Sequence, residues 1–201
     1  MKGTTQYAVL GLLTVEPMSG YDLRKHFQES LIYFWNESYG QIYPALKQLA
    51  RKGFVAPVSG DKPGERDRQL YCLTPKGRDS LRQWLVQPPK RQAIRNEFLM
   101  KLFLGRSAPQ HALSEHIRRF QTGQQDLLAT FLSIRDEVHV EQAKSPNLKY
   151  WMLAIDYGIY MRRAEIAWCR EALRVLASNS RKGDAQLQTP KPRNRRSVRA
   201  G

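Results

Sequence analysis

The N-terminal part of the chain alternates short apolar, periodic segments with turn-forming residues. The segment "TTQYAVLGLLTVE" is almost continuously apolar and is followed by Pro17, so we expect a helix that is buried on most sides. Ser19 and Asp22 have the spacing of a capping box. They precede "GYDLRKHFQESL", in which Leu23 and Phe27 lie four residues apart. This pattern predicts a second helix that begins at the cap.

A third helix is predicted within "ESYGQIYPALKQLARKGFV", residues 37–55. Ser38 and Gln41 form another capping pattern near its start, and Gly53 is typical of a helix end. One stripe has the spacing of a buried helix face and consists of Ile42, Ala45, Leu46 and Leu49. The opposite face carries amides and cations but no carboxylate, and consists of Gln41, Pro44, Lys47, Gln48 and Arg51.

After Gly53 the apolar positions change from the period of a helix to that of a strand. "FVAPVSG" and "RQLYCLT" predict two strands joined by the glycine-containing loop "GDKPGERD". The tip of this hairpin carries the cations Lys62, Arg66 and Arg68. Thr74 then has the position of an N-cap, followed by proline at the first helical position, so a fourth helix is predicted in "TPKGRDSLRQWL".

The Pro-rich, basic stretch "QPPKRQAIRN" predicts a linker at 87–92 between a first domain at 1–86 and a helical domain at 93–177. In the helical domain, apolar residues follow a seven-residue repeat that only Gln124 interrupts, as in a coiled-coil seam. The seam consists of Leu113, Ile117, Phe120, Leu127, Phe131, Ile134 and Val138. The remaining residues, 178–201, are polar and basic, and we expect a disordered tail.

The last predicted helix, "LKYWMLAIDYGIYMRRAEIAWCREALRVLA", has only a narrow polar stripe. A helix with so little polar surface must be covered on two sides. The earlier segment "NEFLMKLFLGR" is apolar on most faces and is expected to be buried. A two-fold homodimer would cover the second face of the last helix, and we favour it over an intrachain three-helix bundle.

The net charge of the 201-residue chain is +15, which indicates a polyanionic partner such as nucleic acid or an anionic membrane. The sign of the charge does not choose between them. No apolar stretch approaches the roughly 18 residues that span a bilayer, and the apolar run 7–15 lacks the cleavage site of a signal peptide. We therefore expect a soluble, cytoplasmic protein with no membrane partner.

Candidate chemistry is sparse. Cys72 and Cys169 are too few for a disulfide framework or a zinc cluster. The four histidines lie in separate polar contexts, and the five-residue spacing of His111 and His116 does not place them on one helical face. Because a glycine-rich phosphate loop and a nucleophile elbow are also missing from the sequence, we expect no catalytic residues, no metal and no cofactor.

Three helices followed by a basic hairpin predict a mainly α fold with a small β-hairpin wing, the winged helix-turn-helix. In that fold the third helix enters the DNA major groove and the wing contacts phosphates or the minor groove. Gln41 would then bond base edges, while Lys47 and Arg51 would meet phosphates or guanine, and Tyr43 would support the backbone contact. A solvated surface is the alternative, but an acid-free face, a basic tip and a positive domain together favour DNA.

Three segments resemble the PadR-like transcriptional regulators: "YAVLGLLTVEPMSGYDL", "GQIYPALKQLARKGFV" and "RQLYCLTPKG". Residues 93–177 further resemble the helical C-terminal domain of the branch that includes phenolic-acid-responsive repressors. The resemblance implies a homodimeric winged-helix repressor with a C-terminal dimerisation region and often a small-molecule effector. The DNA-facing residues that it implies are Ser38, Gln41, Tyr43, Pro44, Lys47 and the wing cations.

The effector site is the least determined part of the sequence. A planar aromatic ligand would suit a pocket lined by Tyr150, Trp151, Tyr157, Tyr160 and Trp168, although aromatic residues at helical spacing also suit a core or a dimer interface. Two function classes stay open: a ligand-responsive repressor that binds an inverted-repeat operator in double-stranded DNA, and a sequence-tolerant, architectural nucleic-acid-binding protein without an effector. Specific binding in competition with random DNA would distinguish them.

Overall fold

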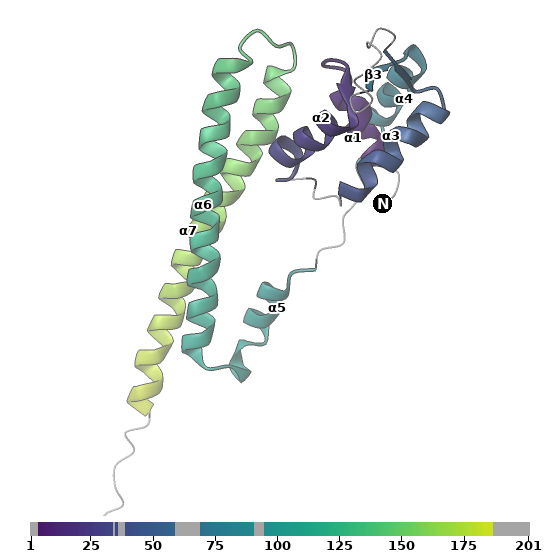
Figure 1. The fold of residues 1–201 in the computed structure, drawn as a ribbon. Coiled ribbons are helices and arrows are strands. Elements are labelled where there is room, and N and C mark those ends of the chain that lie inside the picture. Colours follow the sequence, from purple (N-terminus) through teal and green to yellow (C-terminus); the bar gives the residue numbers. More distant parts are fainter. Residues whose placement is uncertain (1–3, 34, 36–38, 59–68, 91–94, 187–201) are drawn as a thin grey trace, which may run out of the picture. The chain divides into compact units, whose positions relative to one another are not determined.

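The computed structural model describes residues 4–33, 35, 39–58, 69–90 and 95–186. The chain divides into two compact units, with the boundary between Ala93 and Ile94. The first unit contains α1 to α4 and a small sheet, and the second contains α5 to α7 (Figure 1). The fold class is the predicted one: mostly helical, with a small antiparallel sheet in the first unit.

The first unit begins with the predicted helices. Helix α1 spans Thr5–Leu12, α2 spans Gly20–His26 and continues as a π-helical turn at Phe27–Leu31, and α3 spans Ile42–Arg51. The capping box before α2 is confirmed, because the Ser19 hydroxyl accepts from the Asp22 amide and the Asp22 carboxylate accepts from the Ser19 amide. These polar residues fix where α2 begins.

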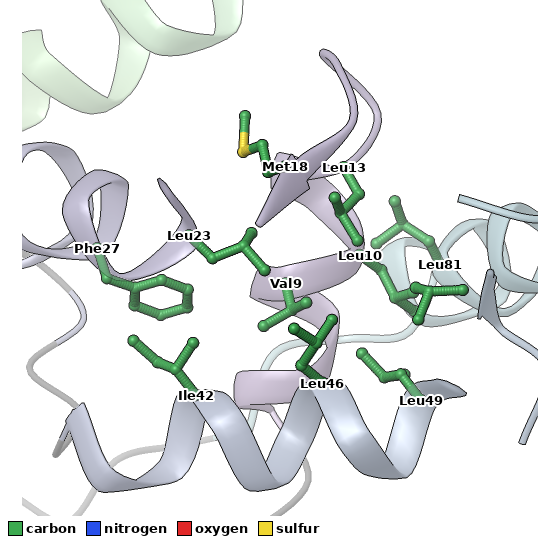
Figure 2. Close-up of a cluster of buried hydrophobic side chains, with 11 residues drawn as sticks. Val9, Leu10, Leu13, Met18, Leu23, Phe27, Ile42, Leu46, Leu49 and Leu81 are labelled. Carbon is green, nitrogen blue, oxygen red and sulfur yellow. The ribbon is translucent and has the colours of Figure 1, made fainter. Parts of the chain in front are cut away.

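The three helices share one apolar core, shown in Figure 2. The side chains of Ile42, Leu46 and Leu49 extend from one side of α3 toward α1 and α2. Across the core they meet Val9 on α1 and residues of α2, of which Leu23 is completely buried. The core thus determines which side of α3 faces outward.

The sheet has three antiparallel strands in the order β1-β3-β2. Strands β2 (Val55–Pro57) and β3 (Leu70–Leu73) form the predicted hairpin, with Ala56 opposite Cys72. Strand β1 (Met18–Ser19) pairs with β3 and was not predicted. Two residues are too few to show the alternation that identifies a strand in a sequence.

Helix α4 spans Pro75–Leu85 and begins as predicted, with the Thr74 hydroxyl accepting from the amide of Gly77. Leu81 is buried in the core of the first unit. Trp84 lies nearer the surface and stacks on Tyr7 of α1, with ring centroids 4.7 Å apart. Helix α4 is therefore packed against the core and α1 through its C-terminal half.

The second unit is dominated by an antiparallel hairpin of α6 (Gln110–Glu141) and α7 (Leu148–Gln186), which run side by side in Figure 1. The predicted seam on α6 faces α7, because its residues are buried or half-buried. Gln124, which interrupts the seam, is also buried, and its Oε1 accepts from Nη1 of Arg162 at 2.8 Å. Its polar group is thus satisfied across the hairpin.

Helix α5 (Glu97–Phe103) contradicts the expected burial of its segment, because none of its residues is buried. It contacts the hairpin through Phe98, whose ring stacks on Phe120 at 4.5 Å and meets Trp168 edge-on at 5.9 Å. Phe103 is 89% exposed. The apolar pattern marks faces that favour burial, but it does not show whether one chain supplies the groups that cover them.

Helix α7 is longer than predicted. It ends at Gln186 and not near Ala177, so its last residues fall in the segment expected to be a disordered tail. No proline occurs between Pro146 and Pro190, so nothing in this stretch forces the helix to end earlier. The rest of that tail, 187–201, lies outside the described residues.

Candidate DNA-binding interface

The polar face of α3 is solvent-exposed. Ile42, Leu46 and Leu49 are buried, and Ala45 is half-buried, as the apolar stripe requires. The exposed residues on the other side are Gln41, Tyr43, Pro44, Lys47, Gln48 and Arg51. Since residues three and four apart share a helix face, most of these form one continuous surface of amides and cations. That surface can donate hydrogen bonds to base edges and phosphates.

The two ends of α3 are built differently. Its start is preceded by a 3₁₀ turn at Tyr39–Gln41, which places Gln41 immediately before the α-helix and Pro44 in its first turn. The cap predicted at Ser38 lies outside the described residues. The end is a Schellman motif: Gly53 has φ +70°, its amide donates to the Ala50 carbonyl, and the Phe54 amide donates to the Leu49 carbonyl.

Tyr43 lies at the edge of this surface and packs on α2. A Cβ added to Gly20 would lie 2.5 Å from Cε1 of Tyr43, so the tyrosine ring occupies the space above the first residue of α2. Tyr43 is nevertheless 44% exposed. The ring is thus held in place on one side while its remaining surface is accessible from solvent.

The strands that carry the wing are well formed up to its base. The amide of Val58 donates to the carbonyl of Leu70 at 2.9 Å, which extends the β2–β3 pairing by one further bond. The predicted wing cations Lys62, Arg66 and Arg68 lie outside the described residues. Their role in DNA binding therefore stays a prediction.

The residues predicted for an effector lie along α7 and do not converge within one chain. Tyr150 and Trp168 are 18 residues apart on the same helix, which corresponds to roughly 27 Å. Tyr157 is exposed, Trp151 is half-buried, and Trp168 contacts Phe98. These residues alone therefore do not form one ligand pocket. Such a pocket would also need residues from outside α7.

An open groove of about 390 Å³ lies between α6 and α7 at a different place. Its apolar lining includes Leu128, Leu132 and Ile166, and Arg163 and Arg170 also line it. Neither the predicted aromatic residues nor the sequence pattern indicated this groove, because its residues come from two helices whose register is visible only in the folded hairpin.

The titratable residues of the described segments include one buried cysteine, Cys169, with a shifted pKa. Within those segments, His, Cys, Asp and Glu nowhere gather in a group of three that could hold a metal ion. Cys169 is buried, and desolvation together with the nearby Glu165 raises the pKa of its thiol. A protonated, buried thiol is a poor nucleophile, so Cys169 acts as a packed apolar side chain.

Two sequence families match the two units. The model of the transcriptional regulator PadR-like family matches residues 9–83, and the model of the virulence activator alpha C-terminal domain matches residues 94–177. The first unit is PadR-like, and the chain is thus similar to the transcriptional regulators of that family. This confirms the resemblance found in the sequence.

The similarity of this PadR-like chain to its relatives covers most of its length. The negative transcriptional regulator PadR of Bacillus subtilis (strain 168) is 26% identical over 176 residues, which are 85% of this chain and 96% of that protein. The crystal structure of Bacillus subtilis PadR in complex with operator DNA has a TM-score of 0.74 and 25% identity, and covers 85% of this chain and 98% of that chain. The Bacillus subtilis PadR structure in complex with p-coumaric acid has a TM-score of 0.72 and 24% identity, over 86% and 94%.

Among the described helices of this PadR-like chain, none is long and apolar enough to cross a membrane.

Sequence reasoning located the outer face of α3 but missed Gly20, which provides the space for Tyr43. The sequence offers one sign of it, since glycine directly after an N-cap is a poor helix former. The partner that needs this space lies on another helix, so the sign becomes interpretable only with the fold.

Proposed function

We propose that this chain is a homodimeric transcriptional repressor that binds an inverted-repeat operator through α3 and the wing, and is released by a small aromatic effector. The observation that carries the proposal is the outer face of α3, which is exposed, free of carboxylates and positioned by a buried apolar stripe. The operator complex of the related Bacillus subtilis PadR supports it.

On this proposal the residues of α3 divide by role. Gln41, at the start of the helix, bonds base edges, while Lys47 and Arg51 meet phosphates or guanine. Tyr43, supported by Gly20, and Pro44 contact the sugar-phosphate backbone, together with Ser38 and the wing cations Lys62, Arg66 and Arg68. The DNA-binding domain would comprise residues 1–86, joined by 87–92 to a dimerisation domain at 93–177.

The uncovered surface of the second unit supports the homodimer. On α7, the exposed residues Tyr150, Leu153, Tyr157 and Tyr160 recur at steps of three and four, as in a helix–helix seam. Helix α5 adds the exposed residues Leu99, Met100 and Phe103. Exposed apolar side chains in such number on a small domain favour association, and a two-fold arrangement lets one surface cover its own copy.

We propose repression and effector release because of what is known of the relatives. The Bacillus subtilis relative is a negative regulator and has been crystallised with p-coumaric acid, an aromatic carboxylate. The aromatic residues Tyr150, Trp151, Tyr157 and Trp168 would contribute to such a site where they meet a second copy. A protein that binds an operator must reach the chromosomal DNA, so we propose a cytoplasmic location.

The direct test is selection of duplexes from a random library by the full-length chain. We expect enrichment of an inverted repeat, bound about a thousandfold or more tightly than a scrambled duplex at physiological salt. Gln41→Ala should alter the selected sequence, whereas Lys47→Ala should weaken binding to every duplex. Failure to enrich any sequence would favour the architectural alternative, and p-coumaric acid is the first effector probe for release of the selected operator.

A further inference from the structure

The C-terminal end of α3 is attached to the start of α4 by several hydrogen bonds. We call Thr74–Gly77 the α4 entry segment. Nζ of Lys76 donates to the carbonyl of Lys52 at 2.9 Å, and the Thr74 hydroxyl lies 2.8 Å from the carbonyl oxygen of Gly53. The Thr74 amide donates to the carbonyl of Phe54 at 3.1 Å. Three consecutive carbonyls that follow α3 are thus engaged by one short segment.

The two segments are also in close steric contact. A Cβ added to Gly77 would lie 2.0 Å from the carbonyl oxygen of Phe54, so a side chain at this position would require the backbone to move. The ammonium group of Lys76 lies 5.2 Å from the centroid of the Phe54 ring, within the range of a cation–π contact. The entry segment therefore has little freedom to shift relative to the end of α3.

The position of Lys76 is unfavourable for its own helix. It lies in the first turn of α4, where the helix dipole disfavours a cation, and that turn contains no acidic residue. The same ammonium group lies at the C-terminal end of α3, where the dipole favours a cation. The charge of Lys76 therefore interacts favourably with the dipole of α3 and unfavourably with the dipole of α4.

We propose that Lys76 is a positioning residue for DNA recognition, which holds the C-terminal end of α3 so that Arg51 meets the operator in one orientation. Lys76 itself need not touch DNA. The inference rests on the proposed function, because it assigns a role in sequence-specific binding. It goes beyond that function by assigning specificity to a lysine that lies outside α3.

The test compares Lys76→Met with Lys76→Arg and with Arg78→Met, which removes an exposed cation of the same helix. For Lys76→Met we expect binding to the selected operator to weaken by roughly threefold to tenfold. Binding to a scrambled duplex, and its dependence on salt, should not change. The Lys52, Gly53 and Phe54 amide resonances should shift in free Lys76→Met. Lys76→Arg, which keeps the charge and the donor, should restore both the affinity and the resonances.

Two results would overturn the inference while leaving the proposed function intact. In the first, Lys76→Met binds the operator as tightly as the wild-type chain. In the second, it weakens operator and scrambled duplex alike and lowers the salt dependence by about one phosphate contact, as Arg78→Met would if the charge alone mattered. A wild-type chain that binds both duplexes equally would overturn the proposed function and the inference together.

Discussion

At the scale of single residues, the interface depends on small side chains as much as on charged ones. Gly20 has no functional group, yet its missing Cβ leaves the space that the Tyr43 ring fills. Gly53 adopts φ +70° directly after the C-cap residue Lys52, and this conformation ends α3 at Arg51. Glycines thus shape both ends of the α3 surface that would contact DNA: Gly20 beside Tyr43, and Gly53 after Arg51.

Gly20→Ala provides a residue-scale test. Alanine is the better helix former by roughly 0.5–1 kcal/mol, so a harmless substitution would raise stability. We expect operator affinity to fall about as much as in Tyr43→Ala, because the added Cβ displaces the ring. The double variant should be no worse than either single variant, as measured by fluorescence anisotropy with the selected operator. Additive losses would show that the two residues act independently.

At the scale of elements, the sequence determined most of the first unit because its start and stop residues act locally. The capping box at Ser19, the N-cap at Thr74 and the terminal Gly53 all have the predicted roles. The predictions that failed concern contacts between segments that are far apart in the sequence. Strand β1 exists only because β3 lies beside it, and the exposure of α5 depends on what covers it, neither of which a period in the sequence can show.

The α6–α7 hairpin illustrates the same limit within one interface. The seven-residue repeat predicted the seam and marked Gln124 as its exception, but not the partner of that residue. Arg162, which was assigned no role, bonds Gln124 and forms an ion pair with Glu165 at 3.2 Å. A partner on another helix can be found only when the register of the hairpin is known.

Gln124→Leu should destabilise the hairpin although leucine suits a seam. The substitution removes the acceptor of a half-buried guanidinium, and such a loss costs about 1–3 kcal/mol in the free energy of unfolding. Gln125→Leu, at an exposed neighbouring position, is the matched control and should change stability little. Urea unfolding followed by circular dichroism measures both. A Gln124→Leu chain at least as stable as the wild type would contradict the assigned role.

At the scale of the whole molecule, the proposed homodimer would cover the exposed apolar residues of α5 and α7, which have no cover within the described part of one chain. Tyr157 and Tyr160 are 66% and 71% exposed, so replacing them should not disturb the fold of the single chain. We expect Tyr157→Glu/Tyr160→Glu to be monomeric by light scattering, with unchanged helicity. Thr122→Glu, at an exposed position on α6, should remain dimeric. A double variant that dimerises as the wild type does would place the interface elsewhere.

In the proposed homodimer, dimerisation and DNA binding would be linked through geometry. Two copies of α3 can enter the major groove on one face of DNA only if their centres lie about 34–36 Å apart, or a multiple of that distance. The selected operator should therefore be an inverted repeat with half-sites roughly 10 base pairs apart, or a multiple. The symmetry of the site then follows from the symmetry of the protein.

The most direct measurement is a gel shift of the full-length chain on operators with insertions between the half-sites. An insertion of five base pairs turns one half-site to the opposite side of the helix, because a full turn takes about 10–10.5 base pairs. We predict that this operator loses tight binding, while an insertion of ten base pairs recovers part of it. Unchanged affinity at five base pairs would contradict the account, because the two α3 helices would then not engage one operator together.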